Sequence, residues 1–522
     1  MKILIKEEAG WKLYIKNETS VWFKGYVHNF TKKQLLIKLS TLDESTLSSF
    51  TKALDGHFSF VIQSPNFVFA AVDKIRSTPL FWRDGFIGWH APSVANNRCT
   101  INKDAILPFR MSGYTINEDT IFNELNALVA GEYVIFKNGK FQRKKYFNYE
   151  PWNTISYDNP RNELANVTIR ILKKMIKSLN GRQVVIPLSA GYDSRLIVSG
   201  LKHLGYKNVK CYSYGTKGNF EAKIAESIAK KLGYQFKYIP LKISTERKFY
   251  NSDEFSNYLD FSDTCVSIQY YQSLSTISRL KNWIDEDAIF VNGNTGDFIS
   301  GGHIKNTLIS KNPLESVQNR SNNIASHIID KHYSLWESLK TDKNIKELKE
   351  KLINRMSNLN RLDNDHGIYE NFEFLNRQSK YVISGQRCYE FYGYEWRLPL
   401  WDDEYLSFWQ GVPFELKREQ KLYKEMLIKE NWGGVWDESI PVNKTKINPS
   451  WIVPLRFFLK LPFVLFGKKY WHRFESGFLY YFMDITRMIC IKSYREVYKS
   501  VFNGPRHHAS YQSEDYINSK LK

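Results

Sequence analysis

A small, hydroxyl-rich turn after an apolar run is the part of this sequence best suited to chemistry. Residues 183–188 read Gln-Val-Val-Ile-Pro-Leu, as a buried parallel strand would, and residues 189–195 read Ser-Ala-Gly-Tyr-Asp-Ser-Arg. Such a turn presents backbone N–H groups at a helix start, which favours an anion such as phosphate. Ser189 and Ser194 can donate to phosphate oxygens, whereas Asp193 suits phosphate only with a divalent cation between them. An ordinary Ser/Asp helix N-cap, worth about 1 kcal/mol, is the alternative.

The elements around this turn predict an open parallel α/β sheet. Helix, strand, helix, strand, helix and strand are predicted in order at residues 162–179, 183–188, 196–201, 208–214, 221–232 and 236–239. Ligands of such sheets bind at the carboxyl ends of the strands, which is where the turn at 189–195 lies. The turn is no Walker A loop, because no Gly-Lys-Ser/Thr is present.

The flanking regions differ from this pattern. Residues 1–148 alternate short apolar runs with turn signals such as Asn138-Gly139, which predicts β-hairpins. Residues 305–435 are mostly polar with helical character.

Composition limits the class of protein. The chain has 522 residues, 43% hydrophobic and 15% aromatic, which excludes disorder, collagen and coiled coil. Its net charge of +20 fits a nucleic-acid binder, a membrane-surface protein or an enzyme for anionic substrates, and equally a Lys-rich codon bias. Five Cys without a CxxC pair argue against disulfide scaffolds and zinc knuckles. Without a signal peptide or an apolar run of about 18 residues, we expect a cytoplasmic location.

Four segments, in the same order, resemble the asparagine synthetase-like ATP pyrophosphatases. Residues 188–194 resemble the SGGxDS pyrophosphate loop, and residues 212–215 resemble the FSIG segment that holds adenine. Residues 292–303 resemble SGDGxDELFGGY, and residues 395–402 resemble ExRxPFLD. Lys421 follows at the distance of the family's lysine.

The resemblance implies ATP and Mg²⁺ as cofactors and assigns roles to residues. Asp193 and Asp297 would bind Mg²⁺, and Lys421, assisted by Lys444 or Lys446, would neutralise charge on the reacting α-phosphate. The residues that would hold ATP are Leu188, Ser189, Gly191, Asp193, Ser194, Ser213, Gly215 and Gly296.

The resemblance also implies a fold with three parts. Residues 1–150 resemble a class II glutamine amidotransferase domain, an α+β fold of antiparallel sheets flanked by helices, through segments 54–60 and 72–82. Residues 151–450 would form an α/β PP-loop synthetase domain, a doubly wound parallel sheet with a helical C-terminal part. Residues 451–522 are a basic, aromatic extension with twelve Lys/Arg and five Asp/Glu.

Two departures from the family change the expected chemistry. Lys2 stands where the amidotransferase has its nucleophilic Cys, so we expect no glutaminase activity, and ammonia or an amine would arrive free or from a separate glutaminase. Phe298 stands where asparagine synthetases have a Glu, and Asn294 replaces an Asp. Glu395 is a candidate to supply the missing carboxylate, the alternative being an ion pair with Arg397.

The extension suggests a further partner. Residues 451–469 mix aromatics with Lys and Arg, which is compatible with peripheral contact with the inner face of a membrane. A helix packed on the synthetase core is the alternative. Nucleic acid is the weaker choice, because no recognised module accompanies the basic residues.

The resulting functional hypothesis is an ATP-dependent carbon–nitrogen ligase that adenylates a small-molecule carboxylate, releases pyrophosphate and transfers ammonia or another amine. A uronic acid of a surface polysaccharide is the suggested acceptor, because relatives of asparagine synthetase amidate such sugars. The alternatives are an inactive scaffold that keeps the fold, to which Lys2 and Phe298 point, and a tRNA-modifying ATP pyrophosphatase.

Overall fold

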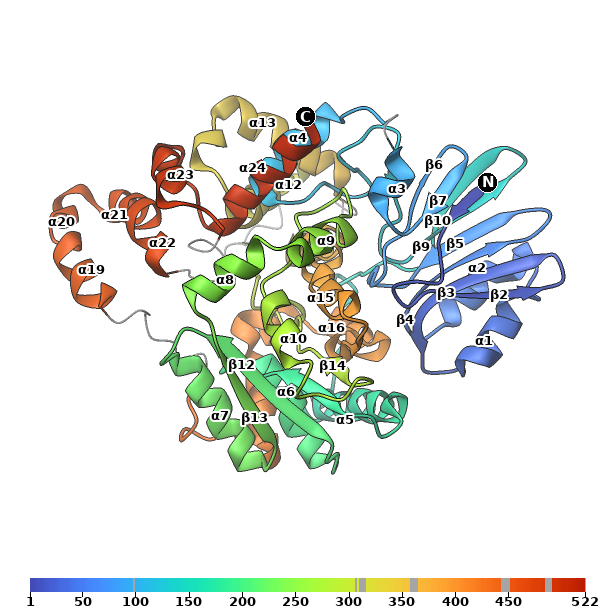
Figure 1. Ribbon diagram of the computed structural model, residues 1–522, viewed down its shortest axis with the longest axis horizontal. Coiled ribbons are helices and arrows are strands. Elements are labelled where there is room, and N and C mark those ends of the chain that lie inside the picture. Colours follow the sequence, from blue (N-terminus) through green and yellow to red (C-terminus); the bar gives the residue numbers. More distant parts are fainter. Residues whose placement is uncertain are drawn as a thin grey trace.

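The computed structural model describes residues 1–96, 99–305, 308, 316–356, 365–442, 451–483 and 491–521. Figure 1 shows a sheet-rich N-terminal part, a central body with a second sheet, and C-terminal helices that project from the body. The largest apolar core runs through both of the first two parts, because Phe81 and Tyr149 belong to the same buried cluster as Ile186 and Phe290.

Two sheets form the N-terminal part. A six-stranded antiparallel sheet has the order β10-β9-β5-β4-β3-β2, and a four-stranded sheet has the order β1-β7-β6-β8. The strands are β1 (Lys2–Leu4), β2 (Lys12–Lys16), β3 (Thr19–Val27), β4 (Gly56–Gln63), β5 (Val68–Val72), β6 (Phe81–Arg83), β7 (Phe86–Gly88), β8 (Asn126–Ala127), β9 (Glu132–Lys137) and β10 (Lys140–Lys145). The predicted hairpin is confirmed at Asn138-Gly139, where both residues have positive φ and join β9 to β10.

Helices accompany these sheets: α1 (Lys32–Leu39), α2 (Glu44–Ala53), α3 (Ala91–Ala95) and α4 (Lys103–Ser112). Leu35, Leu39 and Leu47 of α1 and α2 are buried against the six-stranded sheet in one apolar cluster. The α+β prediction for this part is therefore confirmed.

A five-stranded, fully parallel sheet forms the centre of the chain, in the order β13-β12-β11-β14-β15. Its strands are β11 (Val184–Pro187), β12 (Val209–Gly215), β13 (Gln235–Pro240), β14 (Ile289–Val291) and β15 (Glu395–Arg397), and its first helices are α5 (Pro160–Leu179), α6 (Tyr192–His203) and α7 (Phe220–Leu232). The chain runs outward from β11 to β13 and then returns to β14 on the other side of β11. This reversal is the switch point at which open α/β sheets bind ligands, so the predicted α/β class is confirmed.

The remaining central helices are α8 (Ile243–Tyr250), α9 (Asp253–Phe261), α10 (Leu274–Leu280), α11 (Gly296–Ile299), α12 (Val317–His332), α13 (Asp342–Arg355), α14 (Asp365–Glu373), α15 (Arg387–Phe391), α16 (Asp403–Gly411), α17 (Phe414–Lys417) and α18 (Lys421–Glu430). The described residues of 305–435 are thus mostly helical, as predicted.

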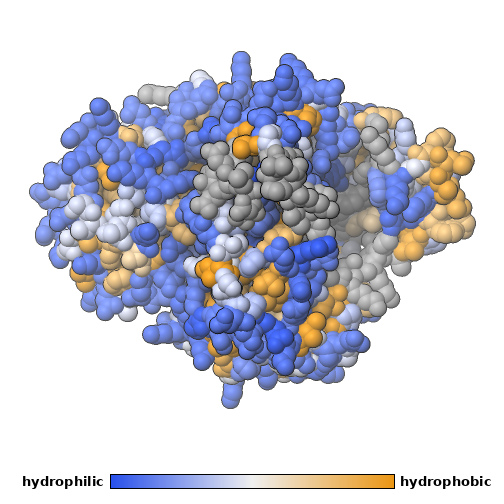
Figure 2. Space-filling model, turned by 180° about the vertical axis from the view of Figure 1, so that it is seen from behind, coloured by the Kyte–Doolittle hydropathy of each residue, from blue (hydrophilic) through white to orange (hydrophobic). Residues whose placement is uncertain are grey.

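The C-terminal helices are α19 (Ile452–Lys460), α20 (Phe463–Phe466), α21 (Lys468–Phe474), α22 (Tyr480–Met483), α23 (Tyr494–Lys499) and α24 (His508–Leu521). The last of them packs on the body, where Tyr516 stacks on Phe109 of α4 with ring centroids 4.9 Å apart. In contrast, α19 and α20 lie at the edge of the molecule (Figure 1), and Figure 2 shows apolar surface gathered there. Among the described residues, no helix has both the length and the apolarity to cross a bilayer.

Candidate functional site

A cavity of about 790 Å³ opens at the carboxyl ends of β11, β12 and β14, at the switch point of the parallel sheet. The fold brings together here most of the residues predicted to hold ATP or metal: Leu188, Ser189, Gly191, Asp193, Ser194, Ser213, Gly215 and Asp297. Gly296 is in close contact with the carboxylate of Asp193. Segments separated by about a hundred residues therefore meet at one edge of the sheet.

The turn from β11 into α6 is held by its own hydroxyl groups. The Ser189 N–H donates to Ser194 Oγ at 3.0 Å, and the Gly191 N–H donates to Ser189 Oγ at 3.1 Å. Gly191 occupies the N-cap of α6 and no side chain caps the helix. The Ser/Asp N-cap considered as the alternative is therefore absent, and the first N–H groups of this twelve-residue helix remain available to an anion.

The second loop of the site, between β14 and α11, approaches the first through glycines. A Cβ at Gly293 would lie 2.7 Å from backbone atoms of Asp193 and Ser194, and a Cβ at Gly296 would lie 2.4 Å from Asp193 Oδ1. Only residues without a side chain allow this contact. The loops therefore bring Asp193 and Asp297 to one point, where the Asp297 N–H donates to Asp193 Oδ2 at 3.1 Å.

The electrostatics of the two carboxylates differ. Burial, and then the neighbouring Asp297, raise the pKa of Asp193 to about 8. Burial also opposes ionisation of Asp297, but hydrogen bonding to His303 outweighs it and lowers the pKa of Asp297 to about 2. Tyr423 donates its hydroxyl to Asp193 Oδ1 at 3.1 Å, and no Lys or Arg among the described residues pairs with Asp193. Two neighbouring carboxylates, one of them buried, offer only oxygen atoms as metal ligands, and oxygen ligands are those that Mg²⁺ prefers.

Sequence reasoning missed a chain of acid and imidazole groups behind Asp297. His303 Nε2 lies 3.1 Å from Asp297 Oδ2, and His303 Nδ1 lies 2.5 Å from Glu373 Oε1. Burial opposes protonation of His303, but Glu373 and Asp297 raise its pKa to about 9. The other oxygen of Glu373 lies 3.1 Å from His332 Nε2. His303 falls inside the predicted segment 292–303, whereas Glu373 ends α14 and carried no sequence signal.

Phe298, the second departure from the family, is fully buried. Its ring centroid lies 6.3 Å from that of Tyr149 and 6.3 Å from that of Trp401. The residue therefore joins the apolar core and carries no proton. On this side of the site, α14 supplies the carboxylate of Glu373, which contacts His303.

Two of the three predicted catalytic residues, Lys421 and Glu395, are described and do not line this cavity. Lys421 is exposed at the first position of α18, while its neighbour Gln420 lines the cavity and donates to Ser300 Oγ at 2.8 Å. Lys446, like Lys444, lies outside the described residues. Glu395 in β15 pairs with Arg182 at 2.8 Å and Arg397 at 3.2 Å, so the ion-pair alternative describes its place in the fold.

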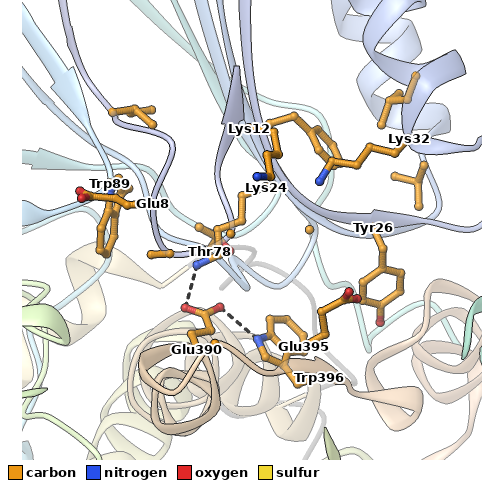
Figure 3. A pocket seen from close by; sticks show the side chains of 18 of the residues that line it. Glu8, Lys12, Lys24, Tyr26, Lys32, Thr78, Trp89, Glu390, Glu395 and Trp396 are labelled. Carbon is orange, nitrogen blue, oxygen red and sulfur yellow. Dashed lines mark hydrogen bonds and ion pairs between the residues drawn. The ribbon is translucent and has the colours of Figure 1, made fainter. Parts of the chain in front are cut away.

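Glu395 lines a second, larger cavity of about 1720 Å³ between the N-terminal sheets and the synthetase region. Figure 3 shows Lys12, Lys24 and Lys32 on the N-terminal side of this cavity. Lys24 pairs with Glu390 at 2.8 Å, and burial lowers the pKa of Lys24 to about 8. Lys2, predicted from the resemblance to stand in place of a nucleophilic Cys, also lines the cavity, and none of the cavity's described lining residues is a cysteine.

His28, Asp55 and Asp402 lie close together beside the larger cavity, which His28 also lines, with ligand atoms within 4.8 Å of one another. A cation already occupies this cluster, because Lys174 Nζ donates to Asp55 at 2.8 Å and to Asp402 at 2.7 Å. The cluster is therefore an ion-pair network of the fold, and a metal ion would have to displace the ammonium group.

Comparison with known protein families finds a match in the central region of the chain. The profile of the asparagine synthase family matches residues 179–429. No curated protein matches the chain.

Two solved structures align with parts of the chain. The NH3-dependent NAD synthetase of Campylobacter jejuni is 17% identical, over 38% of this chain and 94% of its own, with a TM-score of 0.19. An allosteric regulatory enzyme of purine biosynthesis is 14% identical, over 44% of this chain and 62% of its own, with a TM-score of 0.16. These scores are too low to argue for a shared overall structure.

The family match covers the parallel sheet, the turn into α6 and the Gly293–Gly296 loop, which are the parts that build the cavity, and it also includes the exposed Lys421. It ends before the C-terminal helices and leaves out the N-terminal sheets. The part of this chain that is similar to the asparagine synthase family, residues 179–429, is therefore the part that contains the cavity at the switch point.

Proposed function

We propose that this chain is an ATP-dependent amide-forming ligase that activates a small-molecule carboxylate as its adenylate. The observation that carries the proposal is the cavity at the switch point, where the uncapped start of α6 faces the carboxylates of Asp193 and Asp297. The start of the helix suits the phosphates of ATP, and the two carboxylates suit the cation that accompanies those phosphates.

In the proposed reaction, a carboxylate oxygen of the acceptor attacks the α-phosphorus of ATP. The bond to the bridging oxygen breaks, pyrophosphate leaves, and an acyl-adenylate remains. Ammonia or an amine then attacks the acyl carbon, loses a proton and displaces AMP, which gives the amide. Negative charge develops on pyrophosphate in the first step, so groups preorganised around it lower the barrier.

The roles of the residues follow from this reaction. The N–H groups of the first turn of α6 would hold phosphate oxygens, and β12, with Ser213 and Gly215, would face the adenine side. Asp193 and Asp297 would hold Mg²⁺, which when bound neutralises charge on the leaving pyrophosphate. Lys421 and Lys446 remain the candidates for the α-phosphate, and Lys421 would have to swing inward from its exposed position.

We propose further that the chain makes no ammonia of its own. The support is Lys2, because an ammonium side chain cannot form a glutamyl thioester, and the absence of cysteine from the described wall of the larger cavity. Free ammonia, a separate glutaminase or an amine-bearing metabolite would supply the nitrogen. As the acceptor we propose a uronic acid of a surface polysaccharide, an anionic substrate that suits the net charge of +20.

Pyrophosphate release from ATP, with Mg²⁺ and ammonium, tests the proposal over a panel of carboxylates that includes uronic-acid nucleotide sugars and aspartate. We expect release that needs one carboxylate, that disappears in Asp193→Ala, and that glutamine cannot support in place of ammonium. If no carboxylate of the panel supports pyrophosphate release and calorimetry detects no ATP binding, the ligase function is refuted and an inactive scaffold is favoured. ATP binding without turnover would refute only the choice of acceptor.

A further inference from the structure

The outer face of α19 and α20 exposes large apolar side chains to solvent. Phe457, Phe458, Val464, Leu465 and Phe466 are each at least 64% exposed. These residues follow one another over two short helices at the edge of the molecule, where Figure 2 shows one apolar area. Soluble proteins rarely expose so many neighbouring apolar side chains unless the surface binds something. We call this surface, residues 457–466, the apolar edge.

The apolar edge belongs to a lobe formed by helices α19 to α22 and the residues between them, and aromatic side chains pack against one another on the inner side of this lobe. The Phe463 ring lies 5.6 Å from Trp471 and 5.1 Å from Phe474, and Phe474 stacks on Phe478 at 4.7 Å. Arg456 pairs with Glu475 and so joins α19 to the segment after α21. The apolar edge is therefore presented outward by a folded support.

The chain segment that carries the apolar edge has charges of one sign up to Glu475, which pairs with Arg456. Residues 439–474 contain seven Lys or Arg and no Asp or Glu. Lys460 is the last residue of α19 and Lys468 the first of α21, on either side of α20, and neither forms an ion pair with any residue that the structure describes. Apolar side chains flanked by unpaired cations are complementary to a surface that is apolar below and anionic above.

We propose that the apolar edge docks on the surface of a bilayer that contains anionic lipids. Helix α19 has nine residues and α20 has four, which is far shorter than the roughly 20 residues that cross a bilayer. The apolar side chains would therefore enter the boundary between headgroups and acyl chains, while Lys460 and Lys468 contact the phosphates. A second copy of the chain is disfavoured as the occupant, because a symmetric contact would place two surfaces that both carry unpaired cations against each other.

Docking would also position the synthetase cavity. Met483, the last residue of α22 in the same lobe, lines that cavity. A docked lobe would hold the cavity close to the membrane, where an acceptor carried on a lipid would reach it. This consequence rests on the proposed ligase function, whereas docking itself does not.

Co-sedimentation of the full chain with vesicles tests the proposal. The vesicles are phosphatidylcholine alone, or equal parts of phosphatidylcholine and phosphatidylglycerol. We expect binding to the anionic vesicles only, weaker at high salt. Val464→Ser/Leu465→Ser should lower the partition coefficient by about tenfold or more, because two apolar side chains no longer enter the boundary. Lys460→Glu/Lys468→Glu should abolish the preference for phosphatidylglycerol.

Ile15→Ser is the matched control, because Ile15 is 61% exposed but lies on β2, in the N-terminal part. This variant should bind vesicles as the wild type does. All substituted side chains are exposed, and unchanged thermal unfolding would show that the variants are folded. Absence of vesicle binding, or equal binding by Val464→Ser/Leu465→Ser, would overturn the proposal.

Self-association without lipid, lost in Val464→Ser/Leu465→Ser, would overturn the proposal in favour of a second copy as the occupant. Sedimentation velocity measures that outcome. Pyrophosphate release is measured without vesicles, so failure of docking and failure of the ligase function are distinguishable.

Discussion

Gly296→Ala tests whether close contact between the two loops creates the nucleotide site. The new Cβ would lie 2.4 Å from Asp193 Oδ1 and 2.6 Å from Asp193 Cγ, whereas ordinary van der Waals contact begins at 3.4 Å. The Asp193 carboxylate or the loop at 293–297 must therefore move by about 1 Å. A displacement of that size at a positioning group lowers activity by about a hundredfold, and the overpacking costs about 1–3 kcal/mol of stability.

Titration calorimetry of Mg²⁺–ATP with the full chain provides the assay, because it needs no knowledge of the acceptor. We expect at least about a tenfold loss of affinity, since the metal ligand and the start of α6 no longer keep their relative positions. Gly385→Ala is the matched control, because Gly385 lines the same cavity but its Cβ would lie 3.4 Å from the Tyr270 ring. This variant should bind ATP within about twofold of wild type.

Two outcomes would refute the reasoning behind Gly296→Ala. If the variant binds Mg²⁺–ATP as tightly as the wild type, Asp193 is not held in its functional position by this contact. If Gly385→Ala loses affinity equally, the loss reflects general disturbance of the cavity. Thermal unfolding of both variants, followed in the absence of ATP, separates loss of binding from loss of folding.

Two further predictions concern buried charge. Lys417 Nζ lies 3.0 Å from Glu370 Oε2 and both side chains are fully buried, so Lys417→Met should cost about 3–5 kcal/mol in urea unfolding by leaving a carboxylate unpaired. Adding Glu370→Leu should recover most of that loss, and a double variant as unstable as the single one would contradict the argument. Burial, and then Lys417, lower the pKa of His366 to about 3. As the pH falls below about 6.5, His366 is therefore protonated in the unfolded chain but stays neutral in the native chain. Stability should therefore fall by about 2 kcal/mol between pH 7 and pH 5 through this residue, and His366→Phe should remove that part, whereas an unchanged pH profile would refute it.

The parts of the fold predicted from sequence are those with strong local signals. The run at 183–188 became β11 because consecutive apolar residues need burial on both faces, and the Ser-Gly turn after it can only lead into a helix at the strand's carboxyl end. Asn138-Gly139 formed the predicted turn because both residues tolerate positive φ. Asp193 and Asp297 met because parallel strands end at one edge, whatever the chain between them does.

The parts that could not be predicted depend on tertiary placement. Tyr423 reaches Asp193 from α18, and Glu373 reaches His303 from the end of α14, but neither position has a local pattern that differs from an ordinary helix. Glu395 was considered as a catalytic carboxylate because of its segment, yet strand β15 is at the sheet edge and turns the residue towards Arg182 and the larger cavity. Spacing along the chain could not show to which cavity a residue at that edge belongs.

The Phe298 and His303 positions are best understood together. Phe298 is buried among Tyr149, Trp401 and the His303 ring, so a carboxylate in its place would be desolvated close to Glu373. Asp297 and Glu373 already pair with His303 and Arg377, so a third carboxylate would be left unpaired, which costs several kcal/mol, of the order of 3–5. With Phe298 in the core, Glu373 pairs with the His303 imidazolium and lies within hydrogen-bond distance of His332. Phe298 therefore removes a carboxylate from the segment 292–303, but the site keeps a charged acid–imidazole chain in contact with Asp297. Helix α14 supplies the acid of that chain from another part of the fold.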